Sequence, residues 1–79
     1  MKTLTDYDTY IISGLAQGAS IKEVREILRH YNQKPNSESS IDKKLRELRK
    51  RFQCKTTFQL VYELGRYVIE IDIDDILNK

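Results

Sequence analysis

The segment that decides the fold runs from Ser37 to Phe52 and reads Ser-Glu-Ser-Ser-Ile-Asp-Lys-Lys-Leu-Arg-Glu-Leu-Arg-Lys-Arg-Phe. Ser37 or Ser39 can begin a helix, because a serine hydroxyl accepts a hydrogen bond from the free N–H groups of the first helical turn. Apolar residues then recur at the spacing of one helix face: Ile41, Leu45, Leu48 and Phe52. The segment is therefore predicted to be an amphipathic helix over about residues 39–52.

The face opposite these apolar residues is cationic. It carries Lys43, Arg46 and Lys50 together with Glu47, and Lys44 lies on one flank. An apolar seam with a cationic outer face suits a helix that lies on a small core and places its other side in a DNA groove. The four cations are therefore candidate DNA contacts, and a charged face that is simply solvated remains the alternative.

Four further residues are candidate phosphate contacts, because the free N–H groups of a helix N-terminus attract anions. Ser39 and Ser40 stand at the start of the 39–52 helix, and Ser20 and Lys22 stand at the start of the helix predicted before it. The serines are first of all helix caps, so contact with phosphate would be a second role.

Charge is distributed unevenly along the 79 residues. The whole chain carries only +2, but eleven Lys/Arg stand against five Asp/Glu between Lys22 and Lys55, which gives this middle part +6. The two ends together carry −4. A basic middle between acidic ends is typical of a small nucleic-acid-binding domain with one directed face.

Length and composition also exclude several classes of protein. The chain forms one domain, residues 1–79, with a core over about 4–67 and a tail over 68–79. Its single cysteine and single histidine give neither an internal disulfide nor a metal cluster, so no metal and no cofactor are expected. No catalytic constellation or Gly-rich phosphate loop is present, so an enzyme is not expected. No apolar run approaches the length of a membrane span, and the expected location is a reducing cytoplasm.

Helix start and stop signals surround the 39–52 segment. Thr5 or Asp6 can begin a first helix over about 7–16, and Gly18 is expected as its left-handed C-cap. Ser20 and Glu23 form a capping-box pattern for a second helix, and residues 32–36 are turn sequence. With a fourth helix after residue 56 or 57, the prediction is an all-α, four-helix domain with a central helix-turn-helix.

The fourth helix and the tail carry more apolar side chains than one small domain needs. After the helix, Ile69, Ile71 and Ile73 alternate with acidic residues, and alternation favours a strand. Such a tail can pair with its copy, pack irregularly over its own subunit or continue the helix. A two-fold homodimer is predicted, with the interface residues Phe58, Val61, Tyr62, Leu64, Val68 and Ile71.

Over residues 4–64 the sequence resembles the LuxR/GerE-type helix-turn-helix domain of bacterial transcription regulators. Five short motifs in the family order carry the resemblance: Leu4-Thr5; Gly18-Ala19-Ser20-Ile21-Lys22-Glu23-Val24, where the family has Gly-x-Ser-x-Lys-Glu-Ile; Ser37-Glu38-Ser39-Ser40-Ile41, where it has Ser-x-x-Thr-Val; Arg51-Phe52-Gln53-Cys54, where it has Lys-Leu-Gly-Val; and Gln59-Leu60-Val61, where it has Gln-Ala-Val.

The resemblance implies that the third helix enters the major groove of double-stranded DNA and that the fourth helix makes a dimer contact. Two copies would then read two half-sites about one helical turn apart. Without a sensory domain, the chain is similar to the stand-alone members. The expected function is that of a small bacterial-type transcription regulator that binds DNA.

Four features depart from the family pattern. The turn before the third helix is longer over residues 29–36, Arg25 replaces a small Ala, and Asp42 replaces a Lys. Thr57 replaces an Arg that the family pairs with an acid of its first helix, and Tyr10 replaces one of those acids. The long turn, Asp42 and the acidic tail favour the alternative function, a module that pairs with a larger transcription regulator and modulates it without binding DNA.

Overall fold

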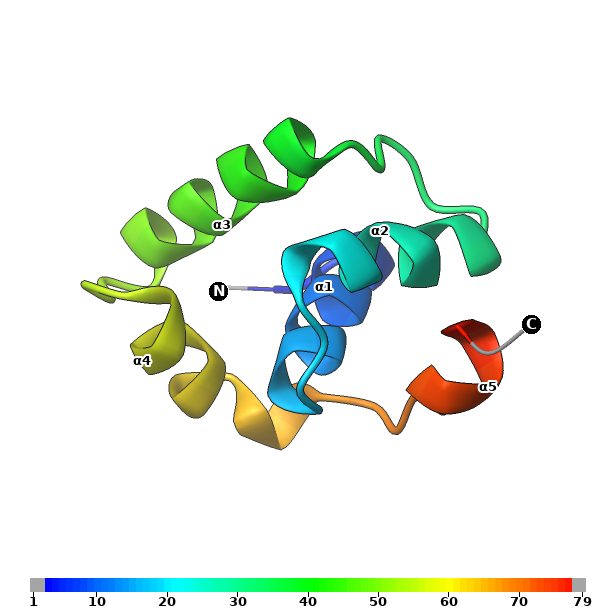
Figure 1. Cartoon of the computed structure of the whole chain (residues 1–79). Helices are drawn as coiled ribbons and strands as arrows, with labels where there is room; N and C mark the ends of the chain where they lie inside the picture. The colour runs from blue at the N-terminus through cyan, green and yellow to red at the C-terminus, as the bar shows by residue number, and fades with distance from the viewer. Residues whose placement is uncertain (1–2, 78–79) are drawn as a thin grey trace.

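The computed structural model describes residues 3–77, and all regular secondary structure in that range is helical (Figure 1). Five α-helices and one 3₁₀ turn follow one another: α1 (Asp6–Ala16), α2 (Ile21–His30), α3 (Glu38–Arg51), α4 (Thr57–Glu63), η1 (Gly65–Tyr67) and α5 (Ile73–Leu77). The predicted all-α domain with a central helix-turn-helix is confirmed. The short helix α5 was not among the four predicted helices, although it lies in the predicted tail.

The helices begin where side-chain caps are available. The Thr5 hydroxyl accepts from the Asp8 N–H, and the Asp8 carboxylate accepts from the Thr5 N–H, so α1 starts with a reciprocal capping box. The same arrangement joins Ser20 and Glu23 at α2, as predicted. For α3 the cap is Ser37, whose Oγ accepts from the Ser40 N–H at 3.2 Å, so this helix begins one residue earlier than the predicted 39–52.

Three helices end in the same way, with a left-handed residue just after the C-cap. These residues are Gly18 (φ 98°) after α1, Asn32 (φ 55°) after α2 and Gln53 (φ 57°) after α3. In each case the next N–H reaches back to a carbonyl in the last turn, at 2.7–2.9 Å, which closes a Schellman motif. The sequence predicted this conformation for Gly18 alone.

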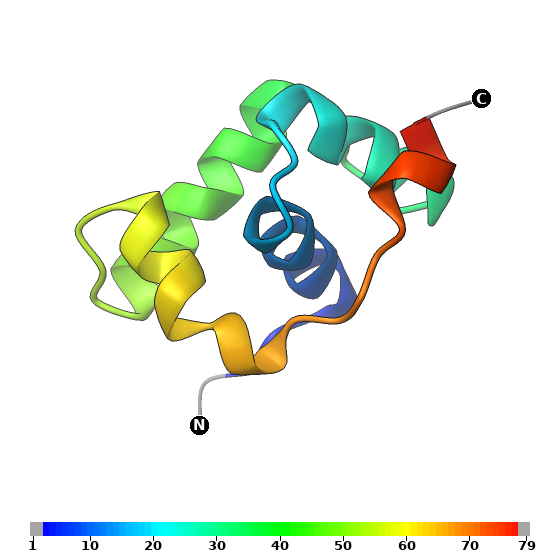
Figure 2. The same ribbon diagram turned by 60° about the horizontal axis from the view of Figure 1, so that its bottom comes forward.

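Helix α1 lies at the centre of the molecule, ringed by the other elements (Figure 2). Its close approach to α2 requires Gly14, because a Cβ atom there would lie 3.0 Å from Cδ1 of Ile27 and 3.3 Å from Cγ2 of Val24. The core that forms around α1 draws on every α-helix and on the tail: Ile11, Ile12, Ala19, Val24, Ile27, Leu28, Ile41, Leu45, Leu48, Leu60, Leu64, Ile71 and Ile76.

The described part of the C-terminal tail, residues 68–77, folds back over its own subunit (Figure 2). Its N–H groups at Ile69 and Ile71 donate to the Ser13 hydroxyl (2.9 Å) and to the Gln17 Oε1 atom (3.0 Å), and the Gln17 amide donates to the Ile69 carbonyl (2.9 Å). Side chains of α1 and of its C-cap residue therefore make the hydrogen bonds that a neighbouring strand would make. Helix α5 then packs against α2 and buries Ile76. Of the three alternatives for the tail, packing over its own subunit is the one observed.

Candidate nucleic-acid interface

The outer face of α3 presents three cations on successive turns. Lys43, Arg46 and Lys50 are all exposed, and within residues 3–77 no hydrogen bond or ion pair engages their side chains. The opposite face of the same helix is buried through Ile41, Leu45 and Leu48. Because the core fixes the rotation of α3 about its own axis, the three cations are held facing solvent. They can bind an anionic surface without first breaking an internal contact.

Lys44, by contrast, is directed inward. Its Nζ atom lies 3.4 Å from Oδ1 of Asp8 and donates to Oε1 of Glu47 at 2.7 Å. Arg51 joins the same cluster, with its guanidinium 3.8 Å from Oδ2 of Asp8 and a hydrogen bond to the Thr3 carbonyl. The sequence placed Lys44 among the DNA contacts, and the structure places it instead in an ion-pair cluster that holds α3 on α1.

The charge of this cluster is centred on Asp8, whose side chain is completely buried. Oδ2 of Asp8 accepts a hydrogen bond from the Thr5 N–H and so caps α1. Oδ1 accepts no hydrogen bond within the described residues, although the Lys44 ammonium lies 3.4 Å from it. The hydrogen bond that Lys44 donates to Glu47 is the main reason why the pKa of Lys44 is raised, and the same bond is the main reason why the pKa of Glu47 is lowered. Both groups are therefore charged at neutral pH, and the positive charge of Lys44 is compensated.

The serines predicted to contact phosphate lie at the helix starts. Ser39 is exposed, and Ser40 is half-buried with its hydroxyl 2.8 Å from that of Ser37. Ser20 is exposed, but its Oγ already accepts from the Glu23 N–H. The cap of α3 is Ser37 and not Ser39, so Ser39 keeps no capping role. The hydroxyls of Ser39 and Ser40 remain near the first turn of α3.

An ion pair joins the middle of α2 to the first turn of α3. Arg25 of α2 is 3.5 Å from Glu38 in the first turn of α3, and this ion pair bridges the two helices. Lys22 is exposed one turn before Arg25. Arg25, which stands where the resembled family has a small Ala, is thus accommodated at the edge between the helices.

Two of the other departures from the LuxR/GerE pattern, Tyr10 and Thr57, have partners within the chain. Tyr10 stacks on Tyr31 with ring centroids 4.3 Å apart and packs the end of α2 against α1. The Thr57 hydroxyl accepts from the Arg49 guanidinium at 2.6 Å, which ties α4 to α3. Asp42 is exposed at the start of α3 beside the cationic face.

The residues of the predicted dimer surface differ in how far they are exposed. Phe58 and Tyr62, one turn apart on α4, are 85% and 78% exposed. Val61 and Val68 are half-buried, whereas Leu64 and Ile71 are buried in the core of their own subunit. Leu64 and Ile71 are therefore corrected to core residues, because both belong to the buried cluster of their own subunit. Two exposed apolar residues outside the predicted set lie nearby in sequence: Tyr67 and Ile69.

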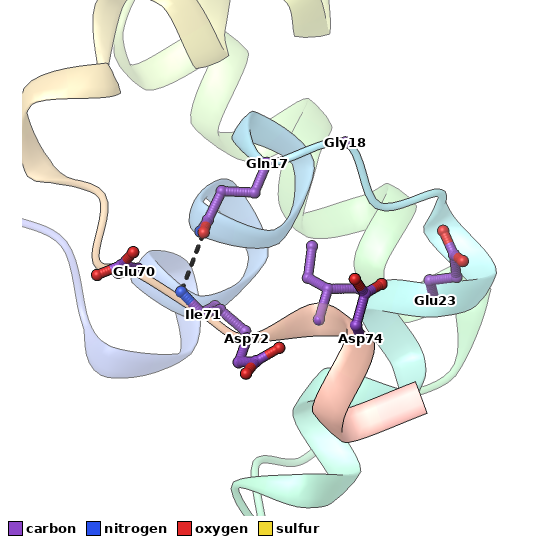
Figure 3. Close-up of a pocket in the computed structure, with 8 residues that line it drawn as sticks. Gln17, Gly18, Glu23, Glu70, Ile71, Asp72 and Asp74 are labelled. Atoms are coloured by element: carbon purple, nitrogen blue, oxygen red, sulfur yellow. Dashed lines mark hydrogen bonds between the residues drawn. The ribbon is translucent and has the colours of Figure 1, made fainter. Parts of the chain in front are cut away.

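The opposite end of the molecule is acidic. A groove of about 740 Å³ runs between the α1–α2 connection and the tail, with carboxylates of Glu23, Glu70, Asp72 and Asp74 around it (Figure 3). Among residues 3–77 no group of three or more His, Cys, Asp or Glu side chains is placed to hold a metal ion. The tail and α3 lie on different sides of α1 (Figures 1 and 2), so the exposed acidic side chains of the tail and the exposed cations of α3 face away from each other.

Comparison of the chain with protein-family models, with curated proteins and with solved structures gave no match. Within the described residues, every helix is too short or too polar to cross a membrane.

Proposed function

We propose that this chain is a small transcription regulator that binds double-stranded DNA, with α3 as its recognition helix. The observation that carries the proposal is the row Lys43, Arg46 and Lys50, which is exposed and engaged in no ion pair within residues 3–77, on a helix whose other face is fixed in the core. The LuxR/GerE-like motifs and the +6 charge of the middle of the chain support the same function. A bacterial cytoplasm is the corresponding setting.

The three cations suit different parts of a DNA groove. Arg46 lies between Lys43 and Lys50 along the helix, one turn from each. An Arg guanidinium can bond a guanine edge with two parallel hydrogen bonds, whereas Lys more often neutralises phosphate. Arg46 would therefore read a base while the two lysines hold the flanking backbone. Lys22 and the Ser39 hydroxyl would add phosphate contacts at the starts of α2 and α3.

The proposal includes a homodimer through α4. Phe58 and Tyr62 are large, adjacent and mostly exposed, and aromatic residues of this kind are enriched at protein interfaces. A two-fold axis beside α4 would bury both rings and place two copies of α3 for half-sites about one helical turn apart.

A salt titration on random-sequence duplex DNA tests the function directly. With roughly three to five phosphate contacts per subunit, log K should fall with log salt concentration at a slope of about −3 to −4 for each subunit engaged. The double variant Lys43→Ala, Lys50→Ala should flatten this slope and leave the melting temperature nearly unchanged. Absence of binding to any duplex at low salt would reject the proposal.

The second candidate function is a module that pairs with a larger transcription regulator without binding DNA. The exposure of Phe58 and Tyr62 favours this second candidate, because the surface of a different protein would bury the two rings just as a second copy would. A monomeric chain that fails to bind duplex at low salt would support this candidate over the first.

A further inference from the structure

We propose that the long turn between α2 and α3 builds a phosphate-binding groove, in which Lys34 and Lys43 together hold one phosphodiester of the DNA backbone. This inference rests on the proposed function and concerns a part of the chain that the resembled family does not have. The groove has a volume of about 580 Å³ and lies between the start of α1, the turn and the first half of α3. Its lining includes Tyr7, Lys34, Pro35, Ser40, Lys43 and Lys44.

The turn is fixed in place by contacts of its own. The Tyr7 hydroxyl donates to the Pro35 carbonyl at 2.6 Å, and the Asn36 amide donates to the Gln33 carbonyl at 3.2 Å. Burial is the main reason why the pKa of Tyr7 is raised, while Lys44 opposes the shift, so the phenol stays protonated and keeps donating at neutral pH. The wall of the groove that carries Lys34 is therefore held by a tether from α1.

The groove keeps a net positive charge, because its lining has three lysines and one acidic residue, Glu47. Lys44 is matched by Asp8 and Glu47, and Glu47 is the acidic residue of the lining. Lys34 and Lys43, in contrast, are exposed, and among residues 3–77 neither ammonium group has a carboxylate oxygen within 4.0 Å. Lys34 lies in the turn and Lys43 in α3, and because both line the same groove, both ammonium groups are available to one anion bound in it.

Hydrogen-bond donors favour a phosphate oxygen at this place. The Ser37 and Ser40 hydroxyls share one hydrogen bond, and when Ser37 donates it the Ser40 hydrogen is free to point into the groove. A phosphodiester carries one negative charge shared by two free oxygens. The two ammonium groups would neutralise that charge, and the hydroxyl would donate a hydrogen bond to one of the oxygens.

Lys43 belongs both to this groove and to the outer row of α3. A DNA strand that follows the groove past Lys43 therefore reaches the side of α3 on which Arg46 lies one turn later. The lengthened turn, which from sequence counts against DNA binding, would add a backbone contact on the side of α3 that faces α1.

The test is fluorescence anisotropy with a labelled random-sequence 20-base-pair duplex over a range of salt concentrations. Lys34→Gln should weaken binding and reduce the size of the salt slope by about 0.9, the value for one phosphate contact. Because Lys34 and Lys43 hold the same phosphate, Lys34→Gln with Lys43→Gln should lose less affinity than the product of the two single losses. Tyr7→Phe, which changes no charge, should reproduce part of the Lys34→Gln loss.

Arg66→Gln is the matched control, because it also removes one positive charge but lies in η1, away from the start of α3 (Figures 1 and 2). If Lys34→Gln behaves like Arg66→Gln while the wild-type chain binds duplex, the inference is overturned and the proposed function stands. A wild-type chain that binds no duplex overturns both. Binding of inorganic phosphate that depends on Lys34, with an unchanged DNA salt slope, also overturns the inference, because the groove would then serve a free anion. Thermal melts of each variant confirm that the fold is intact.

Discussion

The Lys44 ammonium lies 3.4 Å from Oδ1 of the buried Asp8, and this contact ties α3 to the first turn of α1. The adjacent Lys43 has the same chemistry and none of these contacts within the described chain. Of these two neighbouring lysines, Lys44 stabilises the fold and Lys43 lies exposed on the surface. Substitution of each lysine in turn tests this difference.

Lys44→Met should destabilise the fold by about 2 kcal/mol, because it leaves a buried carboxylate with a weaker counter-charge. The value lies below that of a fully buried pair, since Lys44 is partly exposed and Arg51 remains 3.8 Å from Asp8. Urea unfolding measures the change. Lys43→Met is the control and should shift stability by no more than about 0.5 kcal/mol. Equal losses for the two variants would contradict the assignment, and Asp8→Asn in the Lys44→Met background should recover part of the loss.

Gln53→Gly should stabilise the protein by about 0.5–1 kcal/mol, because Gln53 is held at φ 57° and glycine adopts this conformation without steric cost. The reciprocal change, Gly18→Ala, should cost about 1 kcal/mol. A Cβ atom at Gly18 would meet nothing within 4 Å, so that cost would come from the backbone alone. Thermal melts that show a lower melting temperature for Gln53→Gly would refute the prediction.

Ile71→Asp should destabilise the monomer by roughly 3 kcal/mol or more, because it buries a carboxylate among apolar side chains. Ile69→Asp, two residues earlier and 42% exposed, should cost less than about 1 kcal/mol. The loss for Ile71→Asp should not depend on protein concentration, since the residue packs inside its own subunit. A loss that disappears on dilution would indicate an intermolecular contact at Ile71 instead.

Much of the fold could be predicted because its signals are local. The Ser20–Glu23 capping box and the spacing of Ile41, Leu45 and Leu48 require no knowledge of the rest of the chain. The tail could not be assigned, because its extended stretch is held by Ser13 of α1 and by Gln17 just after α1, both far away in sequence. Alternation at Ile69 and Ile71 indicates an extended backbone and does not indicate what the backbone bonds to.

The candidate site was predictable in outline for the same reason. Helical angle separates Lys43, Arg46 and Lys50 from the core face, and all three are exposed as expected. The ion pairs of Lys44 could not be predicted, because they depend on Asp8, a charged residue that the sequence gives no reason to place at full burial. The groove at Lys34 depends on how the long turn packs on Tyr7, which is again a contact between distant parts of the chain.

Asp42→Asn should strengthen binding to random duplex DNA several-fold. Asp42 is exposed next to Lys43 at the start of α3, where its negative charge would repel the phosphate backbone. The gain should shrink as salt is raised, because screening weakens the repulsion. Anisotropy titrations at low and high salt measure both effects. Weaker binding to one preferred sequence with stronger binding to random duplex would instead show that Asp42 reads a base, since a carboxylate can accept from cytosine.

Tyr62→Asp should convert the protein from dimer to monomer without unfolding it. Tyr62 is 78% exposed on α4 and Phe58 is 85% exposed one turn earlier, so neither ring contributes much to the packing of its own subunit. A charge at Tyr62 would have to be buried in the proposed two-fold interface, which is costly, whereas on a monomer it remains in water. Sedimentation equilibrium at tens of micromolar should show a dimer mass for the wild-type chain and for Tyr62→Phe, and a monomer mass for Tyr62→Asp. DNA affinity should fall with the dimer, because one subunit would then bind one half-site at a time. A wild-type chain that sediments as a monomer would exclude the homodimer and leave the two aromatic rings for a different protein.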